Sequence, residues 1–164
     1  MKRLLVIFLQ ALCISATLMA QQSNPENLPY KWEDLTSPRF AKAVELAKGV
    51  CIIPMGVIEK HGPHLPLGTD VYESREASFR AAQQEYAIVF PTYFFGQIYE
   101  ARHQPGTVAY SNELLWKMLE ETCAELSRNG LKKIILVNGH GGNGAFLQCF
   151  CQSQLAKQND YIVV

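Results

Sequence analysis

The chain has 164 residues, with 15 basic and 15 acidic side chains, so its formal net charge is zero. Neutrality argues against a nucleic-acid groove that works through bulk positive charge. The 48% of hydrophobic residues and 18% of charged residues argue against intrinsic disorder. The length is typical of one domain with a hydrophobic core of its own.

The first 20 residues have the three-part layout of a secretory signal peptide. Lys2 and Arg3 precede the apolar run 4–18, and Ala20 precedes a polar stretch. A membrane anchor is the alternative, but the run is short for a span. We therefore expect cleavage after Ala20, export to the periplasm or the medium, and no membrane attachment afterwards. Residues 21–164 would then form the mature domain.

The mature part alternates helical and strand patterns. Ser37 as N-cap and Pro38 open the first helix, which ends near Gly49. The continuous apolar run 50–55 is typical of a strand buried on both faces. Thr69 and Ser111 are the expected N-caps of the next two helices. The pattern predicts these further helices and strands: helices over 70–85, 111–130 and 143–157, and strands over 87–90, 134–137 and 161–164, with 134–137 also buried. This alternation predicts an α/β domain of three layers, α/β/α, with a mostly parallel sheet.

Four cysteines remain after residue 20: Cys51, Cys123, Cys149 and Cys151. They are too few for a disulfide scaffold, and no C-x-x-C pair is present. Cys51, Cys123 and Cys149 lie in apolar segments, so we expect buried thiols there. The sequence leaves open whether any pair forms a disulfide.

Two loops that follow predicted strands contain three of the four histidines. Loop 56–70 carries Glu59, His61 and Asp70, and loop 138–144 carries His140. In open α/β sheets ligands bind at the carboxyl ends of the strands, where both loops begin. Glu59 and His61 are two residues apart, so an extended backbone points both to one side. Imidazole and carboxylate ligands suit Zn²⁺, Mn²⁺ or Fe²⁺, so these loops predict a metal site.

The second loop also matches a glycine-rich phosphate loop, Gly139-x-Gly141-x-x-Gly144, between a strand and a helix. A nucleotide-binding module is therefore an alternative function. It requires a carboxylate at the end of the next strand, and the sequence stops within that strand. It also leaves Glu59, His61 and Asp70 without a role, so we rank it below the metal site.

Residues Glu59 to Asp70 resemble the Glu-x-His-Gly-x-His-Leu-Pro-x-Gly-x-Asp motif of the creatininase (creatinine amidohydrolase) family. Asn138 to Asn143 resemble its second motif, Asn-Gly-His-Gly-Gly-Asn, and Pro105-Gly106-Thr107 also looks like a family element. The resemblance implies an amidohydrolase that cleaves a carbon–nitrogen bond, other than an ordinary peptide bond, of a small or cyclic amide. Metal-bound hydroxide would attack the amide carbon.

The same resemblance implies a metal and catalytic role, by position, for Glu59, His61, Asp70 and His140, with Asp70 as a bridge. A complete chain would hold two divalent ions per subunit, Zn, Mn or Fe. Family members are commonly homo-oligomers, often hexamers, and act on small-molecule amides.

Two positions depart from the family pattern. Lys60 stands where the family usually has Gln, and Gly142 stands where creatinine-hydrolysing members have a further Glu ligand. The downstream carboxylate ligand and the proton-shuttle His that the resemblance implies have no counterpart in this sequence. We therefore expect a C-terminally truncated member that builds one metal site well and the second in part. An inactive or weakly active fragment is the alternative.

Overall fold

The computed structural model describes residues 26–164, so the predicted signal peptide lies outside the described residues. Within that range, none of the helices combines the length and the apolar character needed to cross a membrane. The expected helices and strands are all present, with boundaries that differ by a few residues.

Four parallel strands form the sheet: β1 (Val50–Met55), β2 (Ile88–Val89), β3 (Lys133–Asn138) and β4 (Ile162–Val163). Their order is β2-β1-β3-β4. β1 pairs with β3 along its whole length, from Val50 opposite Lys133 to Met55 opposite Asn138. Because the two strands run parallel and in register, the loops that follow them begin side by side.

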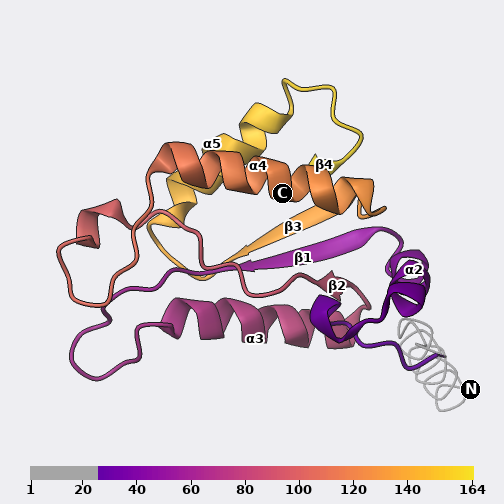
Figure 1. Ribbon diagram of the computed structural model, residues 1–164, viewed down its shortest axis with the longest axis horizontal. Coiled ribbons are helices and arrows are strands. Elements are labelled where there is room, and N and C mark those ends of the chain that lie inside the picture. Colours follow the sequence, from indigo (N-terminus) through magenta and orange to yellow (C-terminus); the bar gives the residue numbers. More distant parts are fainter. Residues whose placement is uncertain (1–25) are drawn as a thin grey trace, which may run out of the picture.

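Helices cover both faces of this sheet, as Figure 1 shows. α3 (Thr69–Gln84) lies on one face, and α4 (Asn112–Arg128) and α5 (Asn143–Gln154) lie on the other. α2 (Ser37–Leu46) lies near the start of β1. Two short 3-10 turns, η1 (Trp32–Asp34) and η2 (Tyr99–Ala101), complete the described elements. The expected three-layer α/β/α fold with a parallel sheet is confirmed.

The main core lies between the sheet and the α4–α5 layer. Ile53 and Met55 of β1 are fully buried there, together with Leu119 of α4. Phe150 of α5 is also fully buried and packs edge-on against Trp116, with ring centroids 5.1 Å apart. Each large side chain buried in this way contributes about 1.5–3 kcal/mol to folding. This packing holds β1 and β3, and therefore their following loops, in fixed positions.

Two helices begin one residue away from the expected position. The N-cap of α2 is Thr36 rather than Ser37, and the N-cap of α3 is Gly68 rather than Thr69. The Thr69 hydroxyl donates to the Pro66 carbonyl oxygen at 2.7 Å. Thr69 therefore stabilises the turn before α3 instead of the free amides of the helix.

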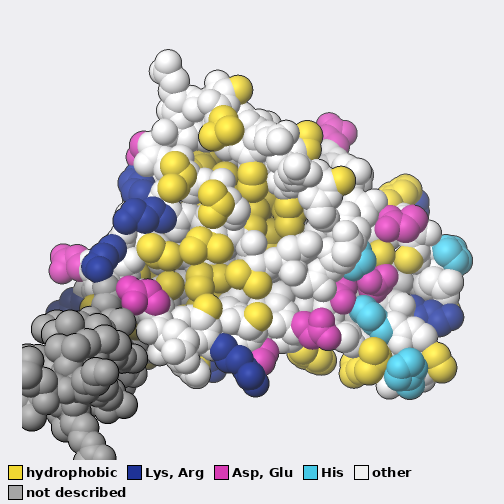
Figure 2. Space-filling view, turned by 180° about the vertical axis from the view of Figure 1, so that it is seen from behind, with side chains coloured by type: hydrophobic (Ala, Val, Ile, Leu, Met, Phe, Trp, Pro, Cys, Tyr) yellow, Lys and Arg dark blue, Asp and Glu magenta, His cyan; other side chains and the backbone are white. Residues whose placement is uncertain are grey.

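The prediction that residues 134–137 are buried is wrong for one face of β3. Ile134 is buried, but Ile135 keeps 38% of its surface exposed and Ile162 of β4 keeps 61%. α3 packs mainly against β1 and covers β3 only in part, so Ile135 and the β4 edge stay partly open on this side. Figure 2 shows hydrophobic side chains gathered in the middle of one side of the molecule.

All four cysteines in the described part of the chain are free thiols. Cys51 and Cys123 are buried as expected, and burial raises the pKa of Cys123 to about 12. The prediction for Cys149 is wrong, because α5 turns that side chain toward solvent. Cys151 is half-buried. The buried thiols stay protonated at neutral pH and act as small apolar side chains.

Candidate metal centre

The structure brings the four predicted ligand residues together at the carboxyl edge of the sheet. Glu59 and His61 lie in the loop after β1, and His140 lies in the turn after β3. Asp70 is in the first turn of α3, where the helix dipole favours a carboxylate. Figure 2 shows acidic and histidine side chains together at this end of the molecule.

Glu59, Asp70 and His140 form a compact group, with ligand atoms that all lie within 4.8 Å of one another. His140 Nδ1 is 2.9 Å from Glu59 Oε1 and 2.8 Å from Asp70 Oδ2. The Asp70 side chain is only 7% exposed and that of His140 only 9%. The three residues therefore converge on one point that is largely shielded from water.

His61 approaches Asp70 from its other oxygen. His61 Nε2 is 2.7 Å from Asp70 Oδ1 and 3.7 Å from Glu59 Oε1. The two carboxylate oxygens of Asp70 thus face two different histidines. On its far side, His61 Nδ1 lies 3.2 Å from the backbone oxygen of Glu59. With its proton on Nδ1, the ring donates to that carbonyl and offers Nε2 to a cation.

The electrostatics of the group reflect carboxylates held close together. Burial raises the pKa of Glu59, the charge of Asp70 adds to that effect, and His140 opposes it. Burial by itself lowers the pKa of His61, but the hydrogen bond and charge of Asp70 overcome it and raise the pKa overall. A divalent ion bound among these groups would offset the negative charge of the two carboxylates.

The local sequence explains how Asp70 reaches His140. A Cβ atom on Gly139 would lie 2.4 Å from the Asp70 backbone oxygen, so only glycine lets α3 start against the end of β3. The His140 amide donates to Asn138 Oδ1 at 3.1 Å, which shapes the turn. Asn138 and Gly139 thus set the positions of the two ligand residues.

The donor set fits a divalent transition metal. It combines two carboxylates with two imidazole nitrogens, the ligands that Zn²⁺ and Mn²⁺ accept in proteins. Asp70 Oδ2 is buried and accepts no hydrogen bond, although it lies 2.8 Å from His140 Nδ1. Asp70 Oδ2 and His140 Nδ1 thus lie close together without forming a hydrogen bond. Two ligand atoms that bind the same metal ion are arranged in this way.

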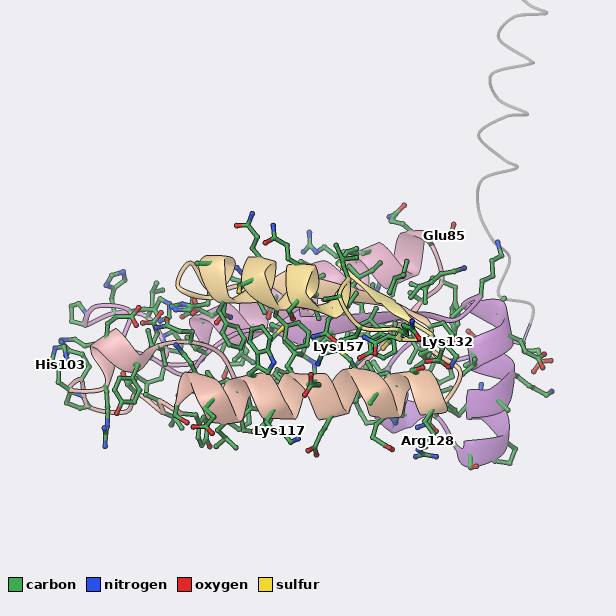
Figure 3. The ribbon with its side chains drawn as sticks, turned by 90° about the horizontal axis from the view of Figure 1, so that it is seen from above. Glu85, His103, Lys117, Arg128, Lys132 and Lys157 are labelled. Atoms are coloured by element: carbon green, nitrogen blue, oxygen red, sulfur yellow. The ribbon has the colours of Figure 1, made fainter. Side chains whose placement is uncertain are left out.

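Three basic residues of the neighbouring loops stay outside the group. His64 is exposed, and Lys60 Nζ donates to Gln104 Oε1 at 3.2 Å. His103 Nε2 lies 2.8 Å from Gln104 Nε2, and Figure 3 shows His103 at the outer end of the molecule. Lys60 is therefore an exposed neighbour whose ammonium group bonds to Gln104.

The sequence did not single out Gln97 and Asn143, which lie beside His140. Asn143 is fully buried at the start of α5, and its Oδ1 accepts from the Gln97 backbone amide at 2.7 Å. Asn143 ends the second family-like motif, so its position was a usable signal. Gln97 lies in the long loop 91–110, where no local pattern marked it.

The glycine-rich turn does connect β3 to α5, as the nucleotide-binding alternative requires. However, Gly139 packs on the Asp70 backbone, and His140 turns toward Glu59 and Asp70. A phosphate group bound there would meet two carboxylates. The geometry therefore favours a cation over a nucleotide.

Comparisons with known proteins agree with this arrangement. Residues 33–164 match the family model Creatininase, described as creatinine amidohydrolase. The chain is 28% identical over 119 residues to creatinine amidohydrolase of Pseudomonas putida, covering 70% of this chain and 46% of that protein. It is 36% identical over 98 residues to mycofactocin precursor peptide peptidase of Mycolicibacterium smegmatis, covering 56% and 39%. A solved structure described as "Creatininase Mn" has a TM-score of 0.71 at 26% identity, covering 82% of this chain and 56% of that one. The chain thus spans less than half the length of these two curated relatives.

Proposed function

Since this chain belongs to the creatininase family, we propose that the protein is a metal-dependent amidohydrolase. Its substrate would be a small or cyclic amide whose carbon–nitrogen bond is hydrolysed. The main support is Asp70, which presents one carboxylate oxygen to His61 and the other to His140. A carboxylate shared in this way suits a pair of metal ions on its two sides.

In this proposal Glu59, His61, Asp70 and His140 hold the ions. Zn²⁺ and Mn²⁺ are the first candidates, with Fe²⁺ as a third, since mixed imidazole and carboxylate ligands accept all three. The relative described as "Creatininase Mn" supports manganese. Bound ions would polarise the amide carbonyl and activate water for its hydrolysis.

The burial of the four side chains suggests a direction of approach for the substrate. Asp70 and His140 are nearly inaccessible, whereas Glu59 is 15% exposed and His61 is 20% exposed. The substrate would therefore enter from the side of the loop after β1. Asp70 and His140 form the closed side, where water is excluded and charge interactions are strong.

Metal removal tests the proposed activity. We expect the purified chain, supplied with Zn²⁺ or Mn²⁺, to hydrolyse at least one member of a panel containing creatinine, cyclic imides and formamides. Dialysis against a chelator should abolish turnover, and adding the ion back should restore it. Liquid chromatography with mass detection measures the products.

The other outcomes of this experiment point to the alternatives. Tight metal binding without turnover would support an inactive or weakly active member of the family. Binding of NAD or ATP that a chelator does not affect would support the nucleotide-binding module and contradict the metal centre.

We further propose that the protein is exported with cleavage after Ala20, so that residues 21–164 form the mature domain. The layout of the first 20 residues supports this proposal. The intact mass of protein recovered from the periplasm of a bacterial host is expected to match a chain beginning at Gln21. We also propose homo-oligomers, hexamers for a complete family member, which light scattering would measure.

A further inference from the structure

His140 has one ring nitrogen whose role the metal centre does not explain. Nδ1 faces Glu59 and Asp70, but Nε2 is buried and has no hydrogen-bond partner among residues 26–164. If Nδ1 binds a metal ion, the ring proton must sit on Nε2 and requires an acceptor. His61 already has such an acceptor, the Glu59 backbone oxygen.

Two candidate acceptors lie close to Gly142, as His140 Nε2 does. A Cβ atom on Gly142 would lie 2.5 Å from His140 Nε2. The same atom would lie 3.0 Å from both the backbone oxygen and the side-chain Oε1 of Gln97. Because residue 142 is glycine, no side chain separates His140 from these two oxygens.

The orientation of the Gln97 amide follows from its partner. Gln97 Nε2 donates to Glu100 Oε2 at 2.9 Å. A carboxylate only accepts hydrogen bonds, so the NH₂ group must face Glu100 and the amide oxygen must face away from it. That oxygen is the atom on the Gly142 side.

The loop that carries Gln97 is tied to the helix that follows His140. The Gln97 backbone amide donates to Oδ1 of Asn143, which is fully buried in the first turn of α5. Asn143 is three residues after His140, and its own amide donates to the His140 carbonyl at 3.1 Å. Gln97 is thereby held beside the histidine by bonds that do not involve its side chain.

We propose that Gln97 is a positioning residue for His140. Its side-chain oxygen accepts the Nε2 proton of His140 and so fixes the ring with Nδ1 toward the metal. Glu100 keeps the Gln97 amide in the required orientation. This inference rests on the proposed role of His140 as a metal ligand. Loss of such a supporting hydrogen bond commonly lowers metal affinity by about 10–100-fold.

Zinc affinity measured by competition with a chelating dye tests the proposal on the full chain. Gln97→Met keeps the volume of the side chain and removes its acceptor, so we expect an affinity loss of about 10–100-fold. Gln97→Glu combined with Glu100→Gln retains an acceptor and a donor between the two side chains, and should bind zinc more tightly than Gln97→Met. Gln152→Ala, an exposed change on α5, is the control and should bind like the wild type.

Two further readouts separate positioning from a general structural role. The melting temperature of metal-free Gln97→Met should match that of the wild type. In ¹⁵N-imidazole spectra of the zinc-loaded protein, the His140 Nε2 proton should exchange slowly in the wild type and rapidly in Gln97→Met. Gly142→Ala, which fills the intervening space, should also weaken zinc binding, whereas Gly144→Ala has nothing within 4 Å and should not.

Wild-type zinc affinity in Gln97→Met, with normal binding by the parent protein, would overturn the role of Gln97 and leave the metal centre intact. Absence of zinc binding by the wild type would instead overturn the metal centre, and this inference with it.

Discussion

Asp70→Asn is expected to abolish metal retention, because Asp70 presents a separate carboxylate oxygen to each of the two histidines. Its Oδ1 lies 2.7 Å from His61 Nε2 and its Oδ2 lies 2.8 Å from His140 Nδ1. Asparagine has the same shape but one oxygen and no charge, so neither side of the residue keeps an anionic ligand. Elemental analysis after dialysis is expected to find less than a tenth of the wild-type metal content.

Thermal unfolding supplies the matching measurement for Asp70→Asn. A ligand that binds only the folded protein at 100 times its Kd adds about 2.7 kcal/mol of stability. Added Zn²⁺ or Mn²⁺ should therefore raise the Tm of the wild type but not that of the variant. Asp34→Asn, at an exposed position in η1, is the control and should respond like the wild type. Full metal occupancy in Asp70→Asn would contradict the assignment of the centre.

Gly139→Ala is expected to damage both stability and metal binding with the addition of a single methyl group. The new Cβ would lie 2.4 Å from the Asp70 backbone oxygen and 2.9 Å from the Ser74 side chain. Since the nearest atom is backbone, the start of α3 must move away from β3. Overpacking of this kind costs about 1–3 kcal/mol, and the displacement carries Asp70 away from His140. Urea denaturation and zinc titration measure the two effects.

Gly141→Ala is the matched control for this change. Gly141 lies two residues further along the same turn, and a Cβ atom there would have nothing within 4 Å. Its backbone does not adopt a positive φ, so alanine is not strained there. We expect Gly141→Ala to fold and to bind zinc like the wild type. If both substitutions had equal effects, contact with Asp70 would not be the reason why this turn requires glycine.

Much of the fold could be predicted because its signals are local. The apolar run 50–55 is a strand buried along nearly all of its length, and Ser111 caps α4 by accepting from the Leu114 amide. The burial of β3 could not be predicted in this way. Its apolar residues match those of a strand covered on both faces, but cover depends on where α3 packs.

The ligand residues could be identified from the sequence for a simple physical reason. Residues that follow neighbouring parallel strands lie at the same edge of the sheet, so Glu59, His61 and His140 had to lie close together. Asp70 joined them because it begins the helix after the same loop. The motifs themselves therefore encode which atoms are available to a metal ion.

Only the tertiary structure decided how those atoms are shared. The division of the two Asp70 oxygens between His61 and His140 depends on how closely α3 packs against the end of β3. The approach of Gln97 to His140 depends on a long loop crossing to α5. Such contacts join segments far apart in the sequence, and their geometry arises from packing, so residue spacing by itself cannot specify it.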